Sequence, residues 1–405
     1  MAAAGGRSLK TRGPLLAVGA ALSVAIVLQA LPALGLGQPD PAVQLRRAAG
    51  LMTLSPSAAD LARGEAMARD ALDRAPMSSR AISLLGQARE RGGKAAEGER
   101  LVKAAYALNH RDPVADLWLF DQALRARRYD EAFLHADALL RRDPVGYDPI
   151  MDAVYAAAAD PAALKPLAAR LAPSPPWREP FFVMMFARRA QPFTYPLFEA
   201  LRTAGSPPTD AEMGQFLRSL VRDERYDQAY LFWLLSLPRG AMENLGYIFD
   251  GEFEGRPMGE PFGWRVMGNA GGAASMEAAP GGGKALLVNS DGYTPGAFAQ
   301  QLIVLPPGRY QLTGRVQTPP NAPVQVLAWT LSCLPKSDPL VSVPTAPTDG
   351  AWRRFSAAFT VPAGCTAQTL ALKAQAGELR TSMTIWYDDL SILPVRGAQV
   401  AEARP

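Results

Sequence analysis

The sequence is poor in the residues from which many catalytic centres are built. It has two histidines and two cysteines in 405 residues, and no histidine follows His135. A Ser-His-Asp or Cys-His arrangement is therefore excluded from the C-terminal part of the chain. The motifs GxSxG, HExxH, the P-loop and the dinucleotide fingerprint are absent, and GGGKAL at residues 281–286 lacks the Walker spacing. We predict that the protein is not an enzyme and needs no catalytic cofactor.

Long runs of basic residues are also missing. The net charge is +4, and the arginines are scattered among Asp and Glu in segments with helical spacing. No basic run with interleaved aromatic residues occurs, so we do not expect nucleic-acid binding. Hydrophobic residues make up 48% of the chain and charged residues 20%, which is the composition of a globular protein.

Charged residues are absent from one long N-terminal stretch. Residues 14–37 form an apolar run of 24 residues, long enough to cross the ~30 Å hydrocarbon core as a helix. Basic residues in segment 1–13 predict a cytoplasmic N-terminus. We therefore expect a single-pass transmembrane anchor in the bacterial inner membrane, with the body of the chain in the periplasm. A cleaved signal peptide, with Ala33 and Gly35 as small residues near the cleavage site, is the alternative.

The two cysteines, Cys333 and Cys365, both lie in the C-terminal part of the chain. An exported chain with one pair of cysteines in one domain favours a disulfide between them. Two separate buried thiols are the alternative. Because 31 residues lie between the two cysteines, the spacing excludes a CxxC redox or zinc site.

Residues 40–240 combine a helical pattern of apolar residues with a degenerate repeat. Gly64, Gly98 and Ala132 follow one another at intervals of 34 residues (98 − 64 and 132 − 98). Small residues at these points would let two helices approach closely. The next positions on the same helix faces keep the interval, and they are Ala68, Val102, Ala136, Ala71, Ala105 and Leu139. We interpret His110 and His135 as ordinary repeat positions, since no second ligand accompanies either at metal-binding spacing.

The 34-residue interval, together with YDEAFLHADALLRRDP at 129–144, resembles the tetratricopeptide repeat. ISLLGQA at 82–88 is similar to the first helix of that repeat. The resemblance implies an α-helical solenoid over residues 40–240 whose concave face binds a protein partner. A compact helical spacer without a partner is the alternative.

From Phe249 onward the pattern changes to short segments bounded by Gly, Pro and Asn. In YQLTGRV at 310–316, for example, apolar and polar residues alternate as in a half-buried strand. About nine such segments predict an antiparallel β-sandwich over residues 248–394. A disordered tail is expected at 395–405. The chain is thus predicted to be multidomain, α plus β.

Five pieces of the C-terminal part resemble, in order, the galactose-binding-like jelly roll of carbohydrate-binding modules. They are DGEFE (250–254), PFGW (261–264), PPGRYQLTGRV (306–316), AWRRFSAAFTVP (351–362) and WYDDLSI (386–392). In that family, acidic residues at the two ends of the domain often hold a structural Ca²⁺ ion, which prefers oxygen ligands. The resemblance implies a calcium site at Glu252, Glu254, Asp388 and Asp389. Surface carboxylates that cap strand ends are the alternative.

The same resemblance implies a polysaccharide ligand. Sugar rings stack on exposed aromatic side chains, and their hydroxyls hydrogen-bond to planar polar groups. The candidate carbohydrate-binding residues are Tyr293, Gln301, Arg315, Gln325 and Trp329. Three further tryptophans in the signature pieces, Trp264, Trp352 and Trp386, are expected in the core.

These features favour a non-catalytic, membrane-anchored periplasmic scaffold. Its helical repeats would bind a protein partner, and its jelly roll would bind an envelope glycan or exopolysaccharide during polysaccharide assembly or secretion. One alternative is a protein-interaction adaptor whose jelly roll is purely structural. The other is a glycan hydrolase with unrecognised catalytic carboxylates, for example Glu252 and Asp388.

Overall fold

The computed structural model describes most of the chain, namely residues 40–52, 56–143, 148–189, 191–255, 259–320, 322, 327–378 and 380–395. The predicted cytoplasmic segment 1–13, the predicted anchor 14–37 and residues 396–405 of the predicted tail lie outside these ranges. Among the helices that the described ranges contain, none is both long and apolar enough to span a bilayer. The chain divides into two compact units, one extending to Pro208 and the other starting at Thr209.

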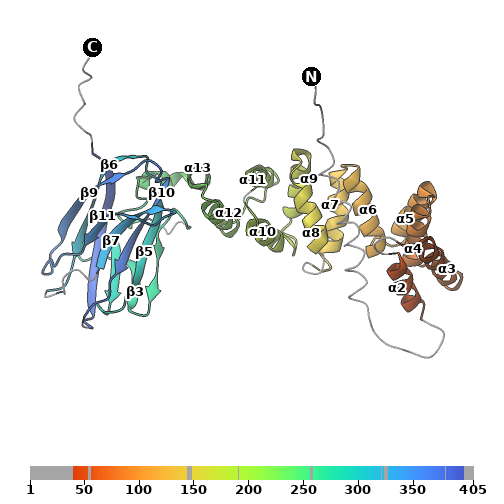
Figure 1. Ribbon diagram of the computed structural model, residues 1–405, viewed down its shortest axis with the longest axis horizontal. Coiled ribbons are helices and arrows are strands. Elements are labelled where there is room, and N and C mark those ends of the chain that lie inside the picture. The colour runs from red at the N-terminus through yellow and green to blue at the C-terminus, as the bar shows by residue number, and fades with distance from the viewer. Residues whose placement is uncertain are drawn as a thin grey trace, which may run out of the picture. The chain divides into compact units, whose positions relative to one another are not determined.

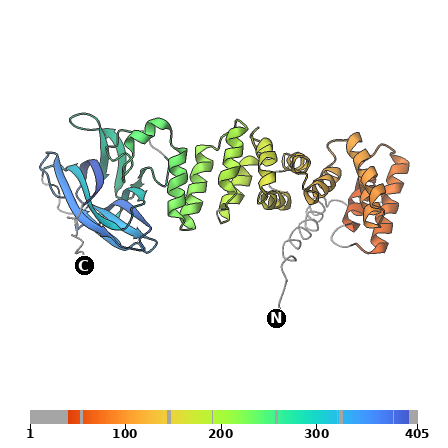
Figure 2. The ribbon, with the colours of Figure 1, turned by 90° about the horizontal axis from the view of Figure 1, so that it is seen from above.

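The first unit is helical throughout its described residues (Figure 1). Its helices are α2 (Pro41–Leu51), α3 (Ala58–Arg74), α4 (Ser79–Arg91), α5 (Ala95–Leu108), α6 (Pro113–Arg125), α7 (Tyr129–Leu140), α8 (Asp148–Ala157), α9 (Pro161–Leu171), α10 (Arg178–Ala187) and α11 (Thr194–Thr203). Consecutive helices lie side by side, as α4 does on α5 and α6 on α7 (Figure 2).

Short capping sequences fix where several of these helices begin. At α6, the carboxylate of Asp112 accepts a hydrogen bond from the N–H of Val114 at 3.0 Å, and Pro113 occupies the first helical position. A proline loses no helical hydrogen bond at that position. At α3, Ser57 and Asp60 form a reciprocal capping box.

The 34-residue interval reappears in the helix boundaries. Helix α6 starts and ends 34 residues after α4 (113 − 79 and 125 − 91). The six residues predicted to line helix faces are all buried on α3, α5 and α7. The expected close approach is present at Gly98, where an added Cβ would lie 2.6 Å from the backbone oxygen of Gly86 on α4. Membership of the tetratricopeptide family stays a prediction.

The second unit begins with α12 (Asp210–Arg222), α13 (Tyr226–Ser236) and the 3₁₀ helix η1 (Arg239–Asn244). Its strands are β1 (Arg265–Val266), β2 (Gly268–Asn269), β3 (Gly272–Ala278), β4 (Lys284–Ser290), β5 (Gly296–Ile303), β6 (Gly308–Gln317), β7 (Leu327–Leu334), β8 (Pro339–Pro344), β9 (Arg353–Val361), β10 (Ala367–Ala374) and β11 (Met383–Pro394).

These strands form two sheets that face each other (Figure 1). One has the order β1-β5-β10-β7-β8 and the other the order β2-β3-β4-β11-β6-β9, with antiparallel neighbours. Between them lies a shared core that includes Trp264, Phe298, Leu312, Trp329 and Tyr387. The structure confirms an α plus β chain with an antiparallel β-sandwich.

An aromatic cluster joins α13 to the sandwich within the second unit. The ring of Trp233 on α13 lies 5.1 Å from that of Phe249 and 5.4 Å from that of Phe262. All three side chains are buried. The chain therefore enters the sandwich through a packed segment rather than through a free linker.

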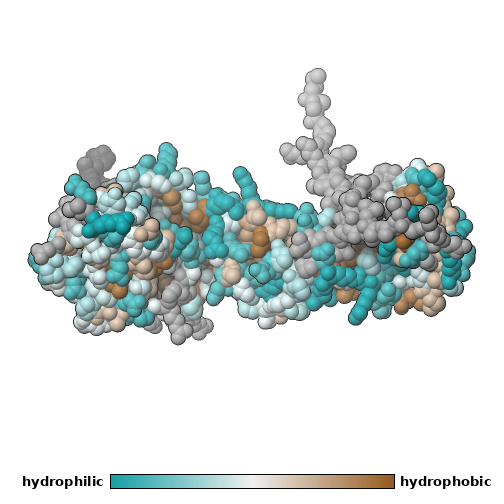
Figure 3. Space-filling model, turned by 90° about the horizontal axis from the view of Figure 1, so that it is seen from below, coloured by the Kyte–Doolittle hydropathy of each residue, from teal (hydrophilic) through white to brown (hydrophobic). Residues whose placement is uncertain are grey.

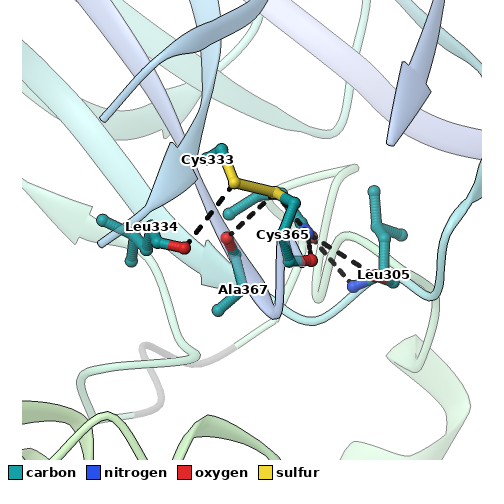
Figure 4. Close-up of a disulfide and its surroundings, with 6 residues drawn as sticks. Leu305, Cys333, Leu334, Cys365 and Ala367 are labelled. Atoms are coloured by element: carbon teal, nitrogen blue, oxygen red, sulfur yellow. Dashed lines mark hydrogen bonds between the residues drawn. A yellow bond between two sulfur atoms is a disulfide. The ribbon is translucent and has the colours of Figure 1, made fainter. Parts of the chain in front are cut away.

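The predicted disulfide between Cys333 and Cys365 is confirmed (Figure 4). It joins the end of β7 to the loop before β10, with the two Cα atoms 5.6 Å apart. Gln368, fully buried, holds this loop in place. Its side-chain nitrogen donates to the carbonyl of Cys365 at 3.1 Å, and its oxygen accepts from the N–H of Leu305 at 2.9 Å.

Hydrophilic residues predominate on the face that Figure 3 shows. The hydrophobic residues visible there gather in small, separate spots. This face therefore offers polar and charged side chains, rather than a broad apolar area, to any partner.

Candidate functional site

The outward side of the six-stranded sheet carries an arginine between two partly exposed tryptophans. Along β6, Leu312 and Val316 point into the core, so Arg315 points outward. In the strand register, Arg315 lies opposite Asp388 on β11 and Arg354 on β9. We call this surface, centred on Arg315, Trp352 and Trp386, the Arg315 face.

Three partners fix the guanidinium of Arg315. Its Nη2 donates to Oδ2 of Asp388, and its Nε lies 3.1 Å from Oδ2 of Asp389. The guanidinium also lies 4.8 Å from the ring centre of Trp352, which is the geometry of a cation–π contact. The β6–β11 register shifts after Asp388, and Asp389 has a φ of 53°. This irregularity brings two successive carboxylates to the same arginine.

The charges of this cluster influence one another. Burial raises the pKa of Asp388, although the hydrogen bond from Arg315 acts against that rise. Burial disfavours the charge of Arg315, but its hydrogen bond to Asp388 and its attraction to Asp388, Asp389 and Glu252 outweigh this and raise its pKa. Arg315 is therefore a permanently charged group held in one position.

Both tryptophans of the Arg315 face are half-buried. Trp386 lies on β11, in register with Leu287 on β4 and Gln317 on β6. Trp352 directly precedes β9, and its Nε1 donates to the carbonyl of Pro280 at 3.3 Å. Part of each ring is open to solvent while the rest packs on the protein. Such rings can stack on the apolar side of a sugar.

The predicted sugar-binding residues do not come together at one place. Arg315 belongs to the face just described. Tyr293, with 44% of its surface exposed, lies in the loop between β4 and β5, and the guanidinium of Arg380 lies 5.4 Å from its ring centre. Gln325 lies outside the described residues.

Two of the predicted sugar-binding residues serve the interior instead. Gln301 is 1% exposed, and its side chain forms two hydrogen bonds with the backbone of Phe249. Trp329 is also 1% exposed and packs against Trp264 and Tyr387. The prediction that Trp329 offers an exposed ring is wrong, because this side chain points into the core between the two sheets.

Trp352 and Trp386 were expected in the core, and that expectation is wrong as well. The signal was present in IWYDD at 385–389. Ile385 and Tyr387 are buried, so the period of two turns Trp386 to the opposite side of the strand.

Three of the four carboxylates predicted to bind calcium have other partners. Asp388 and Asp389 pair with Arg315, and Glu254 accepts a hydrogen bond from the N–H of Lys284 at 2.7 Å. Glu252 is exposed. In the part of the chain that the structure describes, no three His, Cys, Asp or Glu side chains form a group that could hold a metal ion. The described residues therefore do not fit a calcium site at these four carboxylates, and Arg315 supplies the positive charge beside Asp388 and Asp389.

No protein-family profile matches the chain, and no curated protein matches it either. Solved structures similar to it include a CBM4 module, which is 16% identical, with a TM-score of 0.29, over 36% of this chain and 99% of the module. Another is the CBM22-1 xylan-binding domain of Paenibacillus barcinonensis Xyn10C, which is 15% identical with a TM-score of 0.28, over 36% of this chain and 94% of that one. A third is TmCBM61 in complex with β-1,4-galactotriose, which is 17% identical with a TM-score of 0.25, over 39% of this chain and 100% of that one. The sandwich architecture itself rests on the strand pairing.

Proposed function

We propose that the second unit binds a glycan, without catalysis, on the Arg315 face. The observation that supports this proposal is the pair of half-buried tryptophans, Trp352 and Trp386, around an arginine that ion pairs hold still. Rings and a guanidinium that are fixed before binding lose little conformational entropy when a ligand arrives. Exposed polar groups beside Trp386, such as Thr384 hydrogen-bonded to Asn289, offer additional contacts for sugar hydroxyls.

A binding role fits the carboxylates of this face better than hydrolysis does. Asp388 is 3% exposed and accepts a hydrogen bond from Arg315. A general acid or nucleophile must instead reach the glycosidic bond from the wall of a cleft. The engagement of Asp388 by Arg315 therefore supports a non-catalytic module.

Affinity electrophoresis of the protein through gels that contain β-glucan, xylan, galactan or xanthan tests this proposal. We expect at least one polysaccharide to retard the protein, and Trp386→Ala and Trp352→Ala each to weaken binding about tenfold. Tyr293→Ala, which removes an exposed aromatic ring outside the Arg315 face, is the matched control and should bind normally. If no polysaccharide retards the wild-type protein, or if Trp386→Ala is retarded as strongly as the wild type, the Arg315 face is rejected as a glycan site.

We also propose that the helical unit is a scaffold for a protein partner and that the protein works in the periplasm, anchored by residues 14–37. The Cys333–Cys365 disulfide supports an oxidising compartment. Polysaccharide assembly or secretion at the envelope is the setting that joins a glycan-binding module to such a scaffold. A C-terminal fusion to a reporter that is active only in the periplasm should show activity. A fusion to a reporter that is active only in the cytoplasm should be inactive, and activity of this second fusion would contradict the topology.

A further inference from the structure

A cavity lies at one edge of the sandwich. The edge strands β8 and β9 belong to different sheets and approach each other there. Between them is a pocket of about 130 Å³ whose lining includes Val316, Trp329, Val343, Arg353, Phe355 and Tyr387. Arg353 is in register with Val316, which points into the core, so it lies on the inner side of β9. The lining does not include Arg315, which lies on the outer side of the sheet.

The indole of Trp329 forms part of the wall of this pocket. It is 1% exposed, and among the described residues its Nε1 has no hydrogen-bond partner. A buried N–H without an acceptor is unfavourable. The neighbouring hydroxyl of Tyr387, by contrast, is satisfied by the hydroxyl of Thr345 at 2.6 Å. Trp329 therefore contributes an apolar ring to the wall of the pocket, because its Nε1 has almost no solvent-accessible surface.

The pocket is formed before any ligand arrives. Its wall includes the segment 344–348, which is fixed near both ends. The N–H of Thr345 donates to the carbonyl of Leu327 at 2.8 Å. Thr348 and Thr318 exchange two hydrogen bonds of 2.8 Å between their backbone N–H groups and hydroxyls. A pocket with fixed walls has little ordering cost when a small molecule binds.

The chemistry of the lining selects an anion with a small apolar body. Two exposed arginines, Arg353 and Arg354, contribute to the lining, and none of its residues is a carboxylate. Val316, Val343 and Phe355 supply apolar walls. The volume is comparable to that of an engineered cavity of about 150 Å³ that binds benzene, so it holds a group of roughly six heavy atoms.

We propose that this edge pocket binds a carboxylate carried on a short apolar body. The carboxylate would accept hydrogen bonds from the guanidinium of Arg353, which are charge-assisted bonds of the stronger kind. The apolar body would contact Val316, Val343 and Phe355. Free short-chain acids such as pyruvate and pyruvyl substituents on a glycan share this chemistry.

Calorimetric titration of the full-length protein with sodium pyruvate tests the proposal. We expect saturable binding at one site, with methyl pyruvate, the uncharged ester, failing to bind. Arg353→Gln should weaken the affinity about tenfold, whereas Arg309→Gln, which alters an exposed arginine on β6, should leave it unchanged. In ¹⁵N–¹H spectra a single indole resonance should shift, and Trp329→Phe should remove that resonance. Absence of saturable binding, or equal affinities for Arg353→Gln and Arg309→Gln, would overturn the proposal.

Two xanthan preparations, one with its pyruvyl ketals and one freed of them, separate the two sources of the carboxylate. Stronger retardation by the pyruvylated preparation, lost in Arg353→Gln, assigns the pocket to a glycan substituent. If the protein binds free pyruvate but both xanthan preparations retard it equally, the pocket is assigned to a free acid. Because Trp386→Ala tests the Arg315 face and Arg353→Gln tests the pocket, failure of one proposal does not imply failure of the other.

Discussion

The side-chain amide of Gln301 makes two hydrogen bonds to the backbone of Phe249, accepting from its N–H at 3.0 Å and donating to its carbonyl at 2.9 Å. This buried link fixes the segment that leads from α13 into the sandwich. Gln301→Ala would leave both backbone groups buried and unsatisfied. We expect it to lower the free energy of unfolding by about 2–4 kcal/mol, measured by urea denaturation with tryptophan fluorescence.

Gln300→Ala is the matched control for that experiment. Gln300 lies on the same strand, β5, but its register partners Arg265 and Ala371 place it on the outer side of the sheet. Its truncation should change stability by no more than about 0.5 kcal/mol. Equal stabilities of the two variants would show that the Gln301–Phe249 link does not hold the sandwich together.

Asp388 and Asp291 should give opposite dependences of stability on pH. Burial raises the pKa of Asp388, so this group binds its proton more tightly in the folded state than in the unfolded state. Its contribution to the stability of the folded state is most favourable at pH values below its ordinary pKa of 3.8, and this contribution is lost as the pH rises through the folded-state pKa. Between pH 3 and 6, wild type should therefore lose stability relative to Asp388→Asn.

For Asp291 the sign is reversed. Hydrogen bonds from the backbone N–H groups of Thr294 and Tyr293 lower its pKa. Its contribution is present above the ordinary value of 3.8 and is lost as the pH falls through the folded-state pKa. Wild type should accordingly gain stability relative to Asp291→Asn as the pH rises. Urea denaturation at several pH values measures both stability differences. If the difference between wild type and variant changed with pH in the same direction for Asp388→Asn and Asp291→Asn, the assigned pKa shifts would be contradicted.

The Cys333–Cys365 disulfide closes a loop with a sequence separation of 32. In the chain-entropy account, such a cross-link stabilises the folded state by about 4 kcal/mol. We expect the double variant Cys333→Ala, Cys365→Ala to lose stability of this order in the second unit. A reducing agent should destabilise the wild type to a similar extent and leave the double variant unaffected. A wild type that melts identically with and without reductant would show that the cross-link contributes nothing.

Periodicity was sufficient for the helices and the sandwich, and a single pair of cysteines in one exported domain was sufficient for the disulfide. The spacing of Gly64, Gly98 and Ala132 predicts close contact between helices, and this contact is present at Gly98 because contacts between successive helices are local in sequence. The strands after Phe249 were recognised from alternation, which depends only on whether one side of each strand is buried.

The candidate site could be predicted only in part, because it depends on strand register. Arg315 and Asp388 are 73 residues apart, and no local pattern shows that they are neighbours across β6 and β11. The irregularity at Asp389 adds a second carboxylate to the same arginine, so a positive side chain stands where a calcium ion was expected. The sequence around Trp329 does not show which side of β7 faces the other sheet, so its burial between the sheets could not be predicted.

Gly98 and Gly86 lie where α4 and α5 are in close backbone contact. A Cβ at Gly98 would lie 2.6 Å from the carbonyl oxygen of Gly86 and 2.9 Å from the backbone nitrogen of Glu90, both atoms that cannot rotate away. We expect Gly98→Ala to destabilise the first unit by about 1–3 kcal/mol through overpacking, although alanine is the better helix former by about 1 kcal/mol.

Gly214 on α12 provides the matched comparison, because the nearest atom to an added Cβ there is the flexible end of Arg218 at 3.3 Å. Gly214→Ala should therefore be neutral or stabilise the protein by up to about 1 kcal/mol, since only the gain in helix propensity remains. Urea denaturation followed by far-ultraviolet circular dichroism measures both variants. If Gly98→Ala proved as stable as Gly214→Ala, α4 and α5 could not be in backbone contact at these glycines, and the 34-residue interval would need a different physical explanation.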